Sequence, residues 1–188
     1  EPHRFERTRP DGTVIGVVGN PMPGGGFATT YTDVTQQVRA EKEAVAARQQ
    51  LLDAIEGNQD GFVLFDAEEH LVLSNSRYRE LYPKLADILD DPDTTIDKLV
   101  RRTAETGQVR QAVGDVDNWV AMRLEQYRTG NSTHEQQLDD DVWVLASEYK
   151  TAEGGIVGIR ADISDRKRGE DALRVSEQRF KDFADSAS

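Results

Sequence analysis

Few residues in this chain could do chemistry on their own, and their spacing does not bring them together. The three histidines, His3, His70 and His134, are far apart and lack the short intervals at which neighbouring side chains share a metal ion. The sequence has no cysteine, which excludes disulfides and thiolate metal ligands. His70 begins a predicted strand and His134 lies within one, so ordinary partly exposed side chains are the favoured interpretation. We therefore predict no catalytic residue and no metal site.

Two clusters resemble ligand-binding loops but fit turns better. Gly24-Gly25-Gly26 joins two β-rich runs, residues 13–18 and 27–32, and lacks the Lys-Ser/Thr that completes a phosphate loop. A hairpin turn is the expected structure there. The carboxylates of Asp139-Asp140-Asp141 do not have the spacing of a calcium loop, and turn residues explain them. Nothing in this segment therefore indicates an enzyme.

Composition limits the partners of the chain. The net charge is −12 over 188 residues, so the basic surface expected of a nucleic-acid-binding protein is missing. The sequence has no apolar run near the length needed to span a bilayer and no secretory signal. We expect a cytoplasmic protein whose segment contacts neither nucleic acid nor membrane.

A repeat with a period of 129 residues organises the chain. Gly25-Gly26-Phe27 aligns with Gly154-Gly155-Ile156, and Arg39-Ala40-Glu41 aligns with Arg168-Gly169-Glu170, without a gap. A long-period repeat defines the structural unit, and here it predicts a slice through a tandem array. The expected parts are the C-terminal strands of a preceding unit (1–35), a helical linker (36–56), a complete domain (57–164), and a signalling helix with the start of a following unit (165–188).

The complete domain is predicted to be an α+β fold with a five-stranded antiparallel sheet and helices on one face. Hairpin-length turns favour antiparallel pairing, because parallel strands need long crossovers. Asp93-Thr94 with Asp97 resembles a capping box, and Asp115 is expected to cap the next helix. The last strand should lie centrally, beside the first two. The expected strands are residues 61–66, 70–74, 132–138, 141–150 and 155–163, and the expected helices are 76–81, 94–107 and 116–128.

The flanking linkers have the composition of helices and the pattern of a short coiled coil. Residues 34–55 contain no glycine or proline and are rich in Gln, Arg, Ala, Glu and Lys. Apolar residues recur there with alternating four- and three-residue spacing, interrupted by Glu41 and Arg48. The pattern predicts a homodimer that pairs through the linker helices along Val34, Val38, Val45, Leu52 and Ile55.

Several segments of the chain resemble the PAS sensory domain. The opening of that domain is similar to residues 61–66 leading to Leu73-Ser74-Asn75, and its close is similar to residues 154–168. The triplet Asp162-Ile163-Ser164 matches the family's junction between last strand and signalling helix, and Asp33-Val34-Thr35 is a second copy. The resemblance covers essentially the whole chain.

The resemblance implies roles for individual residues. Asp162 would hold the strand-to-helix junction by hydrogen bonding and Ile163 would pack at the start of the helical seam, with Ser164 completing the triplet and Asp33, Val34 and Thr35 repeating these roles. In PAS domains the intervening helices cover a cavity above the sheet. Its candidate lining residues here are Leu99, Thr103, Trp119 and Met122, either around an unidentified small-molecule ligand or as part of a filled hydrophobic core.

The family's best-known cofactors are not expected here. Haem-binding PAS domains place a histidine on the helix before the third strand, and residues 94–128 contain none. Flavin-adduct domains need a cysteine, which is absent from the sequence. We therefore expect neither haem nor flavin.

The resemblance implies a sensor and signal-relay module of a multidomain signalling protein. A bacterial sensor histidine kinase, within a two-component system, is the leading interpretation, with the effector domain further along the same chain. The same sensor array occurs in diguanylate cyclases and phosphodiesterases. A dimerisation spacer that senses nothing is the alternative from a different functional class.

Overall fold

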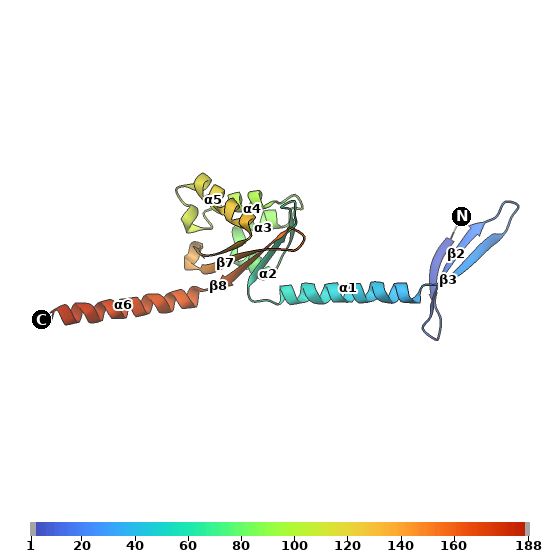
Figure 1. The fold of residues 1–188 in the computed structure, drawn as a ribbon, viewed down its shortest axis with the longest axis horizontal. Coiled ribbons are helices and arrows are strands. Elements are labelled where there is room, and N and C mark those ends of the chain that lie inside the picture. The colour runs from blue at the N-terminus through green and yellow to red at the C-terminus, as the bar shows by residue number, and fades with distance from the viewer. Residues whose placement is uncertain (1–2, 187–188) are drawn as a thin grey trace. The chain divides into compact units, whose positions relative to one another are not determined.

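The computed structural model describes residues 3–186, which form two compact units that divide between Ala54 and Ile55 (Figure 1). The first unit is a three-stranded antiparallel sheet in the order β1 (His3–Thr8), β2 (Val14–Pro21), β3 (Phe27–Asp33). The expected hairpin between the two β-rich runs is confirmed by the pairing of β2 with β3. Gly24, Gly25 and Gly26 all have positive φ in the turn that joins them, a conformation that glycine adopts without steric cost.

Helix α1 (Thr35–Glu56) follows this sheet. None of its residues, all of which the structure describes, is buried. Val45 is 64% exposed and Leu52 is 36% exposed. These two positions of the predicted apolar seam are therefore not buried against the described part of the chain. The coiled coil therefore stays a prediction.

The second unit contains the complete sheet. Its strands are β4 (Gly61–Phe65), β5 (Leu71–Ser74), β6 (Asn131–Gln137), β7 (Trp143–Lys150) and β8 (Ile156–Asp162). They form one antiparallel sheet in the order β5-β4-β8-β7-β6, with β8 between β4 and β7. The predicted five-stranded antiparallel sheet and the central last strand are both confirmed.

Helical segments between β5 and β6 cover one face of this sheet (Figure 1). They are α2 (Ser76–Leu81), α3 (Ala86–Leu89), α4 (Ile96–Glu105) and α5 (Val116–Thr129), joined by the short 3₁₀ turns Pro83–Leu85 and Arg110–Ala112. A further 3₁₀ turn, Asp139–Asp141, joins β6 to β7, and α6 (Ser164–Ser186) follows β8. The core between helices and sheet is built from Val63 and Phe65 of β4, Leu99 and Val100 of α4, and Val120 and Leu124 of α5, among others.

Two predicted helix caps need correction. The α4 helix is capped by Thr95, whose side chain accepts a hydrogen bond from the Lys98 amide, rather than by Asp93-Thr94. Thr94 is fully buried and its hydroxyl donates to the Ile88 carbonyl at 2.5 Å, so it is not available as a cap. Asp115 stands at the expected cap position of α5 but makes no side-chain capping bond there.

Among residues 3–186, no helix is both long enough and apolar enough to cross a membrane. The described part of the chain also contains no group of three or more His, Cys, Asp or Glu side chains that could hold a metal ion.

Candidate functional site

The junction between β8 and α6 is closed by a compact set of hydrogen bonds. Asp162 is the last residue of β8 and Ser164 the first of α6. One oxygen of the Asp162 carboxylate accepts from the Ser164 amide at 3.0 Å and from its hydroxyl at 2.6 Å. The same hydroxyl oxygen accepts from the Trp143 amide at 3.0 Å, and the Ile163 amide donates to the Trp143 carbonyl at 2.8 Å. The end of β8, the start of β7 and the first turn of α6 therefore form one connected structure.

The junction between β3 and α1 repeats this network. One oxygen of Asp33 accepts from the Thr35 amide at 2.9 Å and from its hydroxyl at 2.6 Å. The Thr35 hydroxyl oxygen accepts from the Val14 amide at 2.8 Å, and the Val34 amide donates to the Val14 carbonyl at 2.9 Å. Val14 aligns with Trp143 at the same spacing of 129 residues. The sequence repeat is therefore also a repeat of the hydrogen-bond network.

The second junction has an additional ion pair. The other oxygen of Asp162 accepts from Arg77 of α2 at 3.1 Å. Partial burial would raise the pKa of Asp162, but hydrogen bonds from Ser164 and the charge of Arg77 outweigh it, so the pKa lies below its ordinary value. The carboxylate thus stays ionised near neutral pH, and it connects α2 to the start of the outgoing helix.

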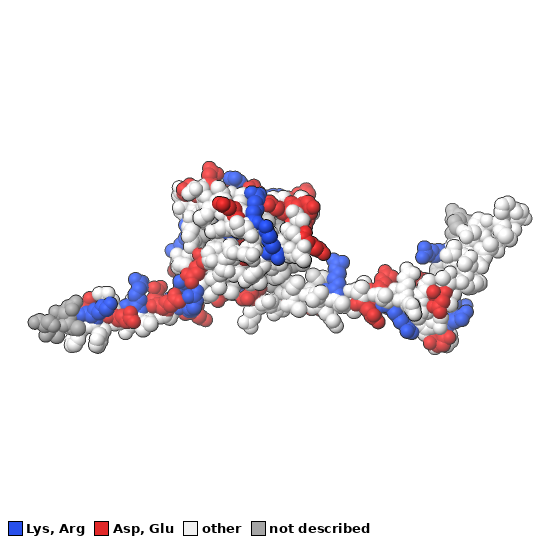
Figure 2. Space-filling view, viewed as in Figure 1, with Lys and Arg blue, Asp and Glu red and all other residues white. Residues whose placement is uncertain are grey.

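Ion pairs also attach the first turn of α6 to strand β6. Glu135 contacts Arg166 at 2.7 Å and Lys167 at 2.5 Å. The Lys167 ammonium also lies 5.0 Å from the centre of the Trp143 ring, a cation–π distance. Hydrogen bonds from Arg166 and then Lys167 hold the pKa of Glu135 below its ordinary value. In Figure 2, acidic and basic side chains are mixed along α6.

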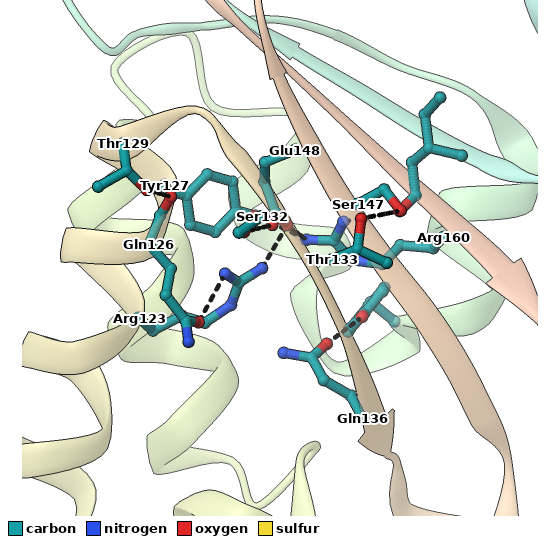
Figure 3. Close-up of polar contacts among 12 residues, drawn as sticks. Arg123, Gln126, Tyr127, Thr129, Ser132, Thr133, Gln136, Ser147, Glu148 and Arg160 are labelled. Carbon is teal, nitrogen blue, oxygen red and sulfur yellow. Dashed lines mark hydrogen bonds and ion pairs between the residues drawn. The ribbon is translucent and has the colours of Figure 1, made fainter.

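A cluster of buried charged side chains lies in the core, between the sheet and helix α5. Arg123 of α5, Glu148 of β7 and Arg160 of β8 are almost completely buried (Figure 3). Arg123 and Arg160 both contact one oxygen of Glu148, Arg160 at 3.0 Å, and Ser132 donates to the other oxygen. Burial would raise the pKa of Glu148, but Arg160 and Arg123 outweigh it, so the pKa lies below its ordinary value. The cluster is thus ionised.

A small cavity adjoins this cluster, and most of the predicted lining residues do line it. Its volume is about 10 Å³, and Leu99, Thr103 and Trp119 line it together with Arg123 and Arg160. Three further lining residues are the aromatic side chains of Tyr78, Tyr82 and Tyr127, and the remaining two are Val100 and Gln136.

Met122 does not line the cavity and is 47% exposed. The inward face of α5 is defined by Trp119, Val120, Arg123, Leu124 and Tyr127. At about 100° per residue, these inward residues occupy an arc of about 140° that begins at Trp119, and Met122 lies about 60° outside that arc.

The predicted relay residues lie at the two strand-to-helix boundaries. Asp33 ends β3 and Thr35 begins α1, with Val34 between them, as Asp162, Ile163 and Ser164 stand between β8 and α6. Ile163 is half-buried. Their role in signalling stays a prediction.

Sequence reasoning missed the buried arginines and the glutamate. Charged residues on strands and helices are normally expected at the surface. One signal was available for Arg160: it shares its strand parity with Ile156, so both side chains had to lie on the same face of β8. Because both parities of these strands are rich in apolar residues, the pattern did not reveal which face was the core.

Comparison with known proteins agrees with this geometry. A family model described as "PAS fold" matches residues 1–42 and 55–171. The chain is 30% identical over 152 residues to the "Non-motile and phage-resistance protein" of Caulobacter vibrioides, an alignment that covers 79% of this chain and 16% of that protein. The chain therefore spans about one sixth of the length of this curated relative.

Two solved structures are among those to which this chain is similar. A domain of a sensory box sensor histidine kinase/response regulator from Geobacter sulfurreducens is 20% identical, with 62% of this chain and 94% of that chain covered and a TM-score of 0.43. The PAS domain of an HTR-like protein from Haloarcula marismortui is 16% identical, with 66% and 98% covered and a TM-score of 0.42.

Proposed function

Because this chain belongs to the PAS-fold family, we propose that it is a sensory and signal-relay module of a larger signal transduction protein, with a histidine kinase as the effector. The observation that supports relay is the duplicated junction. Asp33 with Thr35 and Asp162 with Ser164 form the same hydrogen bonds at the two places where a sheet passes into a long helix. A spacer would need a rigid connection only, and would not require the same polar network at each boundary.

The junction can convert a change in the sheet into a change in the helix. Asp162 is covalently part of β8, hydrogen-bonded to the first residue of α6, and ion-paired to α2. A displacement of β8 against β7 therefore changes the support of the first turn of α6. A bias of a few kcal/mol between two arrangements of the helix is sufficient for a switch.

The relay requires that two copies of the helices lie together, so we propose a homodimer that pairs through α1. Most helical stability in proteins comes from packing of an apolar face, yet the 22 residues of α1 contain no buried position. Val45 and Leu52 are exposed on the same seam and would be covered by the second copy. A second α1 is the simplest surface that is apolar at matching intervals.

Light scattering tests the dimer directly. Replacing both Val45 and Leu52 with Asp should give a monomer, because it puts charges in the proposed seam. The matched control replaces Gln36 and Gln50 with Asp, which adds the same charge on the opposite side of the helix, and should remain dimeric. An unchanged dimer in the seam variant would place the contact on another surface.

A distance measurement tests the relay. The sequence contains no cysteine, so Arg174→Cys on α6 gives a single spin-label site in each copy. In the dimer, Asp162→Ala should shift or broaden the distance between the two labels, because the first turn of α6 loses its anchor. The control Asp165→Ala removes an exposed α6 carboxylate that contacts Arg168, and should leave the distance unchanged. Identical distances in all three proteins would indicate a spacer.

We also propose that the module works without haem or flavin. The helices that cover the sheet, from α4 to α5, contain no histidine for an axial ligand, and the chain contains no cysteine for a flavin adduct. The purified protein should therefore be colourless. A stoichiometric Soret band or flavin spectrum would contradict this proposal.

A further inference from the structure

The core of the second unit contains more buried positive charge than buried negative charge. Arg123 and Arg160 have side chains that are 1% and 2% exposed, and the one carboxylate between them, that of Glu148, is 0% exposed. Both arginines remain protonated in proteins, and the lowered pKa of Glu148 keeps it ionised. The nearby His134 is neutral at pH 7, since burial lowers its pKa to about 4. The cluster therefore has a net charge of about +1 in a water-poor interior.

A single carboxylate compensates only one of the two guanidinium charges. One oxygen of Glu148 already faces both guanidinium groups, and the other accepts from Ser132 (Figure 3). Arg160 uses its terminal nitrogens on the Ile159 carbonyl at 2.8 Å and the Tyr127 hydroxyl at 2.6 Å. Its Nε is buried and has no hydrogen-bond partner. An unpaired buried charge and an unpaired buried donor are both costly, so this arrangement calls for a further acceptor.

The cavity beside Arg160 has room for such an acceptor. At about 10 Å³ it has room for one small group, and its lining includes the polar residues Arg160, Tyr82, Gln136 and Thr103. The Gln136 side chain accepts from the Tyr82 hydroxyl at 3.2 Å, and its amide nitrogen is a donor. A water molecule could satisfy the donor but would leave the charge uncompensated.

We propose that this cavity is a binding site for a small monovalent anion, chloride or formate in size, held by Arg160 and Arg123 with the polar side chains that line the cavity. The small volume excludes bulky ligands, and the excess charge selects an anion over water. That the anion acts as a signal rests on the proposed relay function, whereas its binding does not.

A route from this site to the junction exists in the covalent structure. Arg160 lies on β8 two residues before Asp162, and its register partner on β7 is Ala146. An anion that compensates the charge of Arg160 would change how tightly β8 is held against α5, because Arg160 contacts Tyr127 of that helix. A structural change at Arg160 on anion binding can therefore be transmitted to Asp162 along one strand, β8.

Thermal unfolding of the chain measures binding. Sodium formate and sodium chloride should each raise Tm saturably relative to sodium gluconate of equal ionic strength, because gluconate is too large for the cavity. At ten times Kd the rise should be about 5 °C. A response to formate alone would indicate a carboxylate site, and an equal response to chloride would indicate a general small-anion site. No difference from gluconate would overturn the proposal.

Variants with opposite expected signs identify the residues. Arg160→Met and Arg123→Met each leave a neutral one-to-one pair with Glu148 and should lose the response. Glu148→Gln raises the excess charge and should bind formate roughly tenfold more tightly. The matched control Arg101→Met removes an exposed arginine of α4 and should respond as the wild type does. Retention of the full formate response in both Arg160→Met and Arg123→Met would overturn the proposal.

The two tryptophans separate binding from relay. Trp119 lines the cavity, whereas Trp143 lies at the junction beneath Lys167, and the chain has no other tryptophan. In Trp143→Phe, the emission of Trp119 should change on titration with formate. In Trp119→Phe, the emission of Trp143 should change over the same concentration range if the site communicates with α6. A change in Trp119 alone would uphold the anion site and contradict the relay; no change in Trp119 would contradict the anion site.

Discussion

The two strand-to-helix junctions share one hydrogen-bond network but differ in what surrounds it. At both, a carboxylate accepts from the amide and hydroxyl two residues later, and that hydroxyl accepts from a strand amide. Within residues 3–186, Asp162 alone of these two carboxylates has an arginine, Arg77, hydrogen-bonded to its second oxygen. Positions 166 and 167 are Arg and Lys and contact Glu135, whereas the aligned positions 37 and 38 are Gln and Val, which cannot make those ion pairs.

The comparison extends into the sheets. Gly19 aligns with Glu148 and Tyr31 aligns with Arg160, so the buried ionic cluster exists only in the second unit. Tyr31 is 69% exposed, whereas Arg160 is 2% exposed. The Asp-x-Ser/Thr triplet thus forms the network with only one other residue, which lies on the neighbouring strand. The ionic contacts need a complete domain around the triplet.

The largest expected effect comes from the buried cluster. Glu148→Ala leaves two arginines buried without a carboxylate, and should lower the unfolding free energy of the second unit by about 3–5 kcal/mol. Glu135→Ala, at an exposed glutamate on the neighbouring strand, should cost at most about 1 kcal/mol. Urea unfolding followed by tryptophan fluorescence reports on this unit alone, because Trp119 and Trp143 both lie in it. Equal losses in the two variants would show that the buried charges are not stabilised by Glu148.

This cluster also marks the limit of what the sequence predicted. The sheet order, the central position of β8 and the triplets at the junctions could all be inferred, because turn residues, alternation and repeats are local or periodic signals. Arg123, Glu148 and Arg160 are far apart in the sequence, and their burial depends on mutual compensation across three elements. No local pattern encodes such compensation.

The wrong prediction of the α4 cap also arose because tertiary burial is not visible in the local sequence. Thr94 and Thr95 are equivalent by local sequence, and tertiary burial of Thr94 beside Ile88 decided which of them caps α4. The outward direction of Met122 followed from helical phase, and could have been found once the inward face of α5 was known.

The second prediction separates the junctions themselves. Asp162→Ala removes two hydrogen bonds and an ion pair, and should destabilise the second unit by about 1–2 kcal/mol. Asp33→Ala should leave the tryptophan-detected transition unchanged, because Asp33 belongs to the other unit. The conservative variant Asp162→Asn keeps an acceptor and should fall between wild type and Asp162→Ala. A loss in Asp33→Ala equal to that in Asp162→Ala would mean that the two junctions are energetically coupled.

The third prediction concerns pH. His134 aligns with Phe5, so only the second unit has a half-buried imidazole on this strand. Its folded-state pKa is about 4, lowered chiefly by burial from 6.5, so the unfolded chain binds more protons between these values. The stability from neutral His134 is complete above pH 6.5 and is lost as the pH falls toward 4.

Allowing for solvent screening, the wild type should lose about 1–2 kcal/mol from this group between pH 7 and pH 4.5. His134→Phe should lose measurably less stability over this range than the wild type does. Identical pH profiles for wild type and His134→Phe, in urea unfolding at both pH values, would exclude His134 as the source.

The smallest effect is expected at the surface ion pairs of α6. A double-mutant cycle of Glu135→Gln with Lys167→Gln should give a coupling of about 0.5 kcal/mol that declines in salt. The aligned pair, Glu6 and Val38, serves as the control cycle with Glu6→Gln and Val38→Gln, and should show no coupling because position 38 carries no charge. Equal coupling in both cycles would remove the distinction between the two junctions at this position.

The central claim is that the same network is held more firmly in the complete unit, and amide hydrogen exchange tests it in one sample. The amides of Val14 and Thr35 should exchange faster than those of Trp143 and Ser164, although their hydrogen bonds to hydroxyl and carboxylate have the same pattern. Asp162→Ala should bring Trp143 and Ser164 close to the rates of the first pair. Equal protection of all four amides in the wild type, or no change on Asp162→Ala, would contradict the account.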